Sequence, residues 1–219
     1  MIELLLIRHG ETDWNLERRL QGHVDIPLNA TGHQQAKAVA GALASEHLDL
    51  VVSSDLQRAM QTAEAIAAHK NLDCQIDREW RERSFGGFEG ELIGSLEQRF
   101  PVEYAAWRNH DIDSLFPLNP GTGDHGETVR QFQARIESAL LNLTRYDAQK
   151  IVVVAHGGVL ECVHRIAQHL PLNAPRTVSL LNASINRFAL SVVDDQMVLN
   201  LVQWGDVRHL NGALDEVAQ

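Results

Sequence analysis

The sequence has little of what marks several classes of protein. Its two cysteines, Cys74 and Cys162, are too few for a disulfide framework, so a cytoplasmic location is expected. No apolar run exceeds seven residues, whereas a membrane-spanning helix needs about 20. No basic region precedes the apolar stretch at residues 2–7, so a signal peptide is not expected. Basic residues are also in deficit, with 19 Lys and Arg against 29 Asp and Glu. This excess of acid argues against binding to nucleic acid or to a membrane surface.

What is present is typical of one folded domain. The chain has 219 residues, of which 44% are hydrophobic and 22% charged, both ordinary values for a globular protein. It contains no internal repeat, low-complexity tract or linker. We therefore expect a single domain over residues 1–219.

Short apolar stretches alternate with amphipathic ones, which predicts an α/β fold. Strands are expected at residues 2–8, 48–52, 150–155, 184–192 and 197–204. Helices are expected behind a capping box at 31–34, behind Asp55, near 92–107, at 127–143 and behind His156. This order favours a three-layer α/β/α sandwich with a mostly parallel sheet. The last two strands are expected to be antiparallel and at the sheet edge, where two copies of the chain could pair as a homodimer.

Two segments depart from this alternation. Residues 9–30 are polar and contain Gly, Asn and Pro, so they predict a long loop of the kind that is often functional. Residues 84–126 are interrupted by three prolines and predict an irregular insertion that resembles a lid over a site. Phe85, Phe88 and Trp107 are candidate walls of that site, although ordinary packing would also explain them.

Two of the expected strands end in a histidine that is followed by a glycine. His9 follows the strand at 2–8, and His156 follows the strand at 150–155. Ligands of open α/β sheets bind beyond the carboxyl ends of the strands. If these strands are neighbours, the two histidines meet at one mouth of the sheet.

Arginines occur near the same predicted mouth. Arg8 ends the first strand, and Arg58 lies in the first turns of the helix behind Asp55, where a helix start already favours an anion. Guanidinium groups bind phosphate oxygens through paired donors. The pattern therefore predicts a phosphate site on an otherwise acidic protein.

The ordered motifs resemble the histidine phosphatase superfamily, also called the phosphoglycerate mutase-like family, in its bacterial phosphatase branch. The resemblance spans nearly the whole chain and is carried by Leu6–Thr12, Asp13–Asn15, Gln21–Gly22, Thr31–Gly32, Ser53–Ala59, Arg81–Gly90, Gly126–Thr128, His156–Gly158, Asn182–Ile185 and Trp204–Asp206. It implies a phosphatase that hydrolyses a small soluble phosphomonoester without a metal or other cofactor. The reaction would pass through a phosphohistidine intermediate.

The resemblance also implies a role for each matching residue. His9 corresponds to the nucleophile, and Glu82 to the carboxyl group that protonates the leaving oxygen. Arg8, Arg58 and His156 correspond to the groups that hold the phosphoryl oxygens. The further positions expected to contact phosphate or substrate are Asn15, Gln21, Gly22, Arg83 and Gly157. Without the resemblance, Glu82 would read as a solvated carboxylate in an Arg-rich stretch.

The chemistry sets requirements on these groups. His9 must be neutral at the attacking nitrogen, so its other nitrogen should donate to a backbone carbonyl. A protonated His156 is expected to add its charge to those of Arg8 and Arg58, since phosphoryl transfer depends on positioning and charge stabilisation. Glu82 needs a raised pKa to act as an acid at neutral pH.

Three other functions remain open. A phosphoglycerate mutase that uses a bisphosphoglycerate cofactor carries Glu-Arg-His-Tyr-Gly where this chain has Glu82-Arg83-Ser84-Phe85-Gly86. The change favours a hydrolase, although Arg83 could still bind an anionic group. A metal-dependent phosphohydrolase is suggested by eleven histidines, but these are dispersed and no His-Glu-x-x-His occurs. A non-catalytic phospho-ligand binding protein would be expected to lack one of the five catalytic groups.

Overall fold

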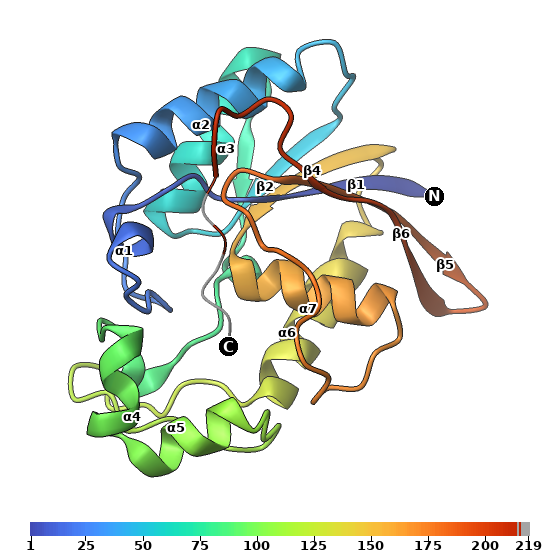
Figure 1. Ribbon diagram of the computed structural model, residues 1–219. Coiled ribbons are helices and arrows are strands. Elements are labelled where there is room, and N and C mark those ends of the chain that lie inside the picture. The colour runs from blue at the N-terminus through green and yellow to red at the C-terminus, as the bar shows by residue number, and fades with distance from the viewer. Residues whose placement is uncertain (214, 216–219) are drawn as a thin grey trace.

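Residues 1–213 and 215, which a computed structural model describes, fold around a six-stranded sheet of order β3-β2-β4-β1-β5-β6 (Figure 1). The strands are β1 (Ile2–Arg8), β2 (Leu50–Ser53), β3 (Cys74–Ile76), β4 (Lys150–Ala155), β5 (Ile185–Val193) and β6 (Gln196–Asp206). The four strands from β3 to β1 are mutually parallel, whereas β5 and β6 each run antiparallel to the preceding strand of the sheet. The predicted, mostly parallel sheet is confirmed.

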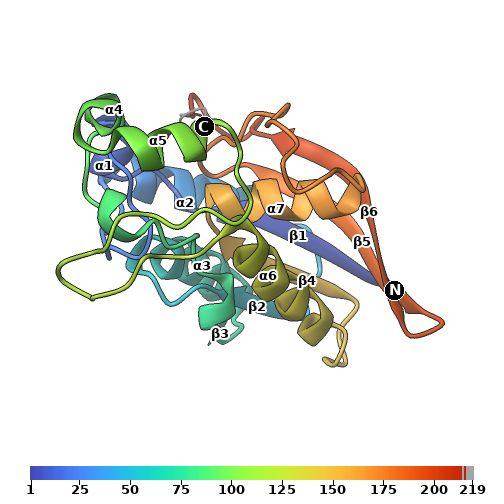
Figure 2. The same cartoon turned by 90° about the horizontal axis from the view of Figure 1, so that it is seen from below.

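Four helices cover the sheet, two on each face, and complete the predicted three layers (Figures 1 and 2). They are α2 (Ala30–Ala42), α3 (Gln57–Lys70), α6 (Val129–Leu143) and α7 (Gly157–Ala167). Successive residues of a strand point to opposite faces. Leu4 and Leu6 of β1 therefore pack with α6 and α7, while Leu5 and Ile7 pack with α2 and α3. Because both faces are buried, the central strands read as continuous apolar runs.

The register of β1 and β4 brings the two His-Gly sequences together. The strands are parallel neighbours, and Arg8 lies opposite Ala155. Both strands therefore end at the same level, and the N–H of His9 donates to the Ala155 carbonyl at 2.9 Å. His9 and His156 leave the sheet side by side, as the sequence predicts.

The two late strands form the predicted antiparallel hairpin at the sheet edge. Val193 pairs with Gln196, so a two-residue turn joins the strands. Asp194 and Asp195 in this turn have φ of 48° and 61°. Aspartate tolerates this left-handed conformation, and such turns match the twist of paired strands.

The expected cap of the second helix is wrong. Helix α2 is capped by Asn29 rather than by Thr31, because the Asn29 side chain accepts the Gly32 N–H at 2.8 Å and donates to Glu11 at 2.9 Å. The sequence analysis also missed β3, which adds a short strand at the sheet edge. Its residues are partly or fully exposed and form no apolar run.

The insertion at 84–126 lies apart from the three layers and beside α1 (Asp13–Leu16) (Figures 1 and 2). The expected helix at 92–107 is split into α4 (Leu96–Arg99) and α5 (Pro101–Arg108), since Pro101 starts a new helix. Two short 3-10 turns also lie in the insertion, η2 (Gly86–Phe88) and η3 (Ile93–Ser95). A third, η1 (Arg78–Trp80), lies just before it in the chain. The insertion shares a separate core with Leu20 of the loop at 9–29; this core is formed by Leu20, Phe85, Phe88, Leu96, Trp107 and Phe116.

Candidate active site

His9 has the geometry of a neutral nucleophile. Its side chain is buried at the end of β1, and its Nδ1–H donates to the carbonyl oxygen of Gly10 at 2.7 Å. This bond leaves Nε2 as the nitrogen with the lone pair. Burial, together with the charges of Arg58 and Arg8, holds the pKa of His9 well below its usual value. The neutral state expected from the sequence is therefore the favoured one.

His156 also favours the neutral state, which corrects the expectation that it is protonated. Its ring centroid lies 5.2 Å from that of His9. Its Nδ1 accepts a hydrogen bond from Nε of Arg58 at 3.2 Å, so the ring proton resides on Nε2. Burial and the nearby charge of Arg58 hold the pKa of His156 well below its usual value. The ring contributes an N–H donor rather than a charge.

The Nε2–H of His156 is prepared for an anionic acceptor. This atom is buried and has no hydrogen-bond partner within the described part of the chain. An unsatisfied buried donor costs about 1–3 kcal/mol, and a phosphoryl oxygen that accepts from it would remove that cost.

Backbone carbonyls hold the two buried arginines. Arg58 donates from Nη1 to the Val24 carbonyl at 2.9 Å and from Nη2 to the Gly22 carbonyl at 2.8 Å. Arg8 donates to the carbonyl of Leu180. The loop at 9–29 thereby fixes Arg58, which the sequence placed in α3, beside the end of β1. The two guanidinium groups supply the fixed positive charge of the site.

Glu82 lies where the helix α7 begins. Its Oε2 accepts the Gly158 N–H at 2.9 Å, and its Oε1 accepts the Arg83 N–H at 2.8 Å. A Cβ on Gly158 would lie 2.2 Å from Oε1, so only glycine allows this approach. Backbone donors at a helix N-terminus favour the carboxylate form. The protonated form of Glu82, which a general acid requires, must therefore be stabilised by a nearby negative charge, such as that of a bound phosphate.

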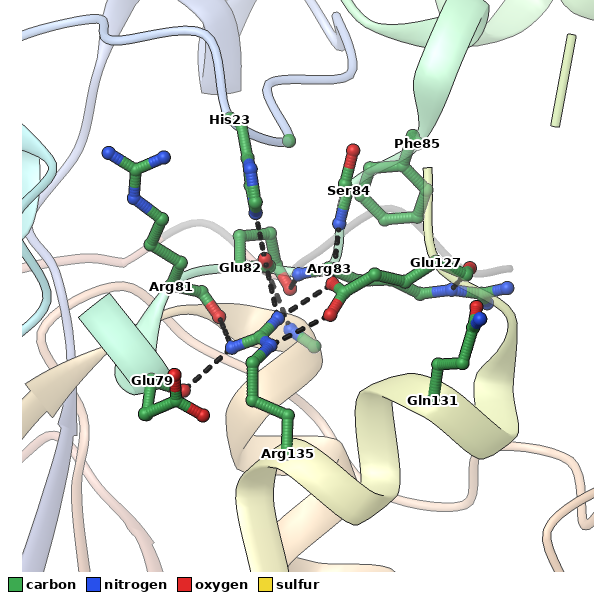
Figure 3. Close-up of polar contacts among 12 residues, drawn as sticks. His23, Glu79, Arg81, Glu82, Arg83, Ser84, Phe85, Glu127, Gln131 and Arg135 are labelled. Atoms are coloured by element: carbon green, nitrogen blue, oxygen red, sulfur yellow. Dashed lines mark hydrogen bonds and ion pairs between the residues drawn. The ribbon is translucent and has the colours of Figure 1, made fainter. Parts of the chain in front are cut away.

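A clamp from α6 fixes the segment that carries Glu82 (Figure 3). Arg135 donates to both carboxylate oxygens of Glu127 at 2.7 Å, and also to the carbonyls of Glu79, Arg81 and Glu82. Glu127 in turn accepts the Ser84 N–H at 3.0 Å. Burial alone would raise the pKa of Glu127, but Arg135 and the Ser84 N–H together lower it. The sequence analysis missed this clamp because Arg135 lies far from Glu82 in sequence.

Three of the five catalytic groups, His9, Arg58 and Glu82, line one pocket, whereas Arg8 and His156 are buried behind them and are not part of its lining. His9, Arg58, Glu82, Gln21 and Gly22, all predicted from the sequence, line this pocket. The other lining residues are Arg19, Leu20, Phe85, Ile93, Trp107 and Gly158. Phe85 and Trp107 thus serve both as walls and as core. Phe88 is fully buried in the aromatic core and does not line the pocket.

Three of the further predicted contact residues also lie outside the lining. Asn15 completes the capping box of α1, where its side chain accepts the N–H of the N-cap residue Thr12 at 3.0 Å, so it supports the loop. Gly157 is the first residue of α7 and precedes the glycine that holds Glu82. Arg83 lines a second pocket beside the first.

Other positioning residues were not singled out from the sequence. Thr62 accepts the Gly10 N–H at 3.0 Å and donates to the Arg58 carbonyl at 2.8 Å, which links the two halves of the site. Asn182 donates to the His9 carbonyl at 3.0 Å. It belongs to a motif that the resemblance included, and this was the signal available for it.

The part of the chain that the structure describes contains neither a metal-ligand cluster nor a membrane-spanning helix. Within residues 1–213 and 215, no three His, Cys, Asp or Glu side chains are placed to bind a metal ion together. No helix in that part of the chain is long and apolar enough to cross a membrane.

Comparison with known proteins decides the family. The model of the histidine phosphatase superfamily (branch 1) matches residues 4–204. The chain belongs to this superfamily. The resemblance inferred from the sequence is thus confirmed. Enzymes of the superfamily among its relatives carry the names of both mutases and phosphatases.

Among these histidine phosphatases, probable phosphoglycerate mutase GpmB of Proteus mirabilis is 37% identical over 225 residues, which cover 99% of each chain. The structure of a mycobacterial glucosyl-3-phosphoglycerate phosphatase with VO3 has a TM-score of 0.75 and 27% identity, over 94% of this chain and 99% of that one. The structure of a putative alpha-ribazole-5'-P phosphatase from Escherichia coli has a TM-score of 0.75 and 30% identity, over 93% and 97%.

Proposed function

We propose that this histidine phosphatase hydrolyses a small soluble phosphomonoester, without a metal ion, through a phosphohistidine at His9. The observation that carries the proposal is the tautomer of His9. Its Nδ1–H is bound to the Gly10 carbonyl at 2.7 Å, so the lone pair of Nε2 is free to attack. Arg58 and Glu82 line the same pocket.

In the first step, Nε2 of His9 forms a bond to phosphorus while the bond to the alcohol oxygen breaks. The leaving oxygen takes the proton of Glu82. The negative phosphate, close to the Glu82 carboxyl, favours its protonation before this step. Arg8, Arg58 and the Nε2–H of His156 stabilise the charge on the phosphoryl oxygens.

In the second step, a water molecule gives its proton to Glu82 and forms a bond to phosphorus. The bond between phosphorus and Nε2 breaks, and its electron pair returns to His9. Inorganic phosphate leaves, and Glu82 is protonated for another cycle. Two displacements replace one difficult step.

A mutase is the second candidate, because relatives with 35–37% identity are named probable phosphoglycerate mutases. The side chains at 84 and 85 favour hydrolysis. The Ser84 hydroxyl donates to Glu89 at 3.2 Å, and Phe85 packs in the aromatic core. Neither offers a free polar group to a second phosphate. The five groups His9, Arg8, Arg58, Glu82 and His156 are all present, which weighs against a purely binding role.

The test is phosphate release from a panel of phosphomonoesters in excess chelator, with His9→Ala as the control. Release by the parent, none by the variant and an acid-labile phosphoenzyme in the parent alone are the expected results. Release that chelator abolishes would contradict the metal-independent mechanism. Isomerisation of phosphoglycerate without net release would favour the mutase.

A further inference from the structure

A second pocket adjoins the proposed catalytic pocket. Phe85, Trp107 and Gly158 line both pockets. Glu82 lines the first pocket and its neighbour Arg83 the second. Because Glu82 protonates the leaving oxygen in the proposed mechanism, the alcohol part of a substrate would point towards the second pocket.

Arg83 is a buried cation that forms no ion pair among the described residues, although the carboxylates of Glu127, Glu82 and Glu161 act on it from a greater distance. It is 6% exposed, and its Nε donates to the Glu127 carbonyl at 2.9 Å. Its guanidinium carbon lies 4.7 Å from the ring centroid of Phe116. Figure 3 shows this guanidinium away from the Glu82 carboxylate. No carboxylate of the described residues is within ion-pairing distance of Arg83, and its two terminal nitrogens donate to none of them. Burial lowers the pKa of Arg83 to about 10, so it remains charged at neutral pH.

The other charges of the second pocket are already balanced or solvated. Arg165 donates to Glu161 at 2.7 Å and to the Ala174 carbonyl. Asp111 is exposed at the rim. Arg83 therefore leaves one buried positive charge, which matches one carboxylate better than a phosphate dianion. Its two terminal nitrogens form the parallel pair of donors that binds a carboxylate through both oxygens.

The walls of the second pocket indicate the character of the ligand. They include the side chains of Phe85, Trp107, Val129, Phe132 and Leu172. Such walls favour an apolar or aromatic body between the phosphate and the anionic end.

We propose that the second pocket binds the alcohol part of the substrate, and that Arg83 binds a carboxylate at its far end. The preferred substrates are then phosphomonoesters of alcohols or phenols with an apolar body and a terminal carboxylate. This inference rests on the proposed phosphatase activity and names its substrate class.

A matched pair of esters tests this assignment. In 3-(4-phosphooxyphenyl)propanoate and its primary amide, two methylene groups separate the phenol from the group that differs, so the leaving oxygens are nearly equivalent. We expect the parent to prefer the acid over the amide in kcat/KM by about tenfold to a hundredfold. We also expect it to prefer the acid over 3-phosphoglycerate.

Arg83→Gln should reduce the acid-to-amide ratio to near one, and Arg83→Lys should retain part of it. Arg130→Gln is the control, because Arg130 is exposed on α6 and pairs with Asp113. Its ratio should equal that of the parent. If Arg83→Gln does not fold, Val129→Glu places a competing carboxylate in the same pocket and should also lower the ratio.

The outcomes separate this proposal from the one it rests on. A parent ratio near one, or a high ratio that persists in Arg83→Gln or in Val129→Glu, overturns the role of Arg83 and leaves the phosphatase activity standing. Absence of phosphate release by the parent from any ester overturns both.

Discussion

Replacing Gly158 with alanine tests how strictly the backbone of α7 holds Glu82. The new Cβ would lie 2.2 Å from Oε1 of Glu82, whereas ordinary contact begins at 3.4 Å. The carboxylate must therefore move by about an ångström and give up the hydrogen bond from the Gly158 N–H. A displacement of that size can cost about a hundredfold in rate, which also lies within the range for loss of a general acid.

The loss should depend on the leaving group. An alkoxide needs the proton from Glu82, so we expect kcat/KM for an alkyl phosphate to fall about a hundredfold. A nitrophenolate leaves without a proton, so the loss for nitrophenyl phosphate should stay below about tenfold. The assay is kcat/KM for a series of phenyl phosphates of similar size and graded phenol pKa, with Glu82→Gln beside Gly158→Ala.

Gly41→Ala is the matched control, because a Cβ at this helical glycine would meet nothing within 4 Å. It should raise the free energy of unfolding by about 0.5–1 kcal/mol and leave turnover unchanged. An equal loss for every leaving group in Gly158→Ala would show that the methyl group only narrows the pocket. That result would refute the argument that Gly158 positions the acid.

Two further predictions concern the clamp and the histidines. Arg135→Met should lower the free energy of unfolding by about 2–3 kcal/mol and also lower turnover, because it breaks a mostly buried pair with Glu127. Urea titration should show no such change for the exposed Arg130→Met, and equal effects would contradict the clamp. The pKa values of His9 and His156 are both lowered by burial, so the unfolded chain binds their protons first as the pH falls below 6.5. Below pH 6.5, each of these two histidines should lower the free energy of unfolding by about 1.4 kcal/mol per pH unit, and above pH 6.5 neither should change it. The urea midpoint should therefore fall between pH 6.5 and about 5.5, and fall less steeply in His9→Asn; a flat profile would contradict the neutral state of both rings.

The structure could be predicted from the sequence where a single physical feature determines it. Strands β1 and β4 are buried on both faces, so they form apolar runs that no surface requirement interrupts. Each strand is followed by a histidine, and the rule for parallel sheets places His9 and His156 at one edge. The family motifs then placed Arg58 and Glu82, which contact that edge from distant segments.

The structure could not be predicted from the sequence where it depends on competition between several contacts. The charge of His156 follows from a hydrogen bond with Arg58 and from burial, and neither can be read from a motif. Asn29 caps α2 in place of Thr31 because it also reaches Glu11. The position of Arg83 depends on how the insertion folds around its own aromatic core.

The carbonyls of Arg8 and His9 are bound by Asn182 and Ala183, which lie more than 170 residues later in the chain. The ribosome therefore adds these groups long after it adds His9 itself. Domains form as their segments leave the ribosome, and contacts over such separations form late. A growing chain therefore carries its reactive histidine through the synthesis of more than 170 further residues before these contacts can form. Catalytic activity of the chain thus indicates that the segment leading into β5 has folded against β1.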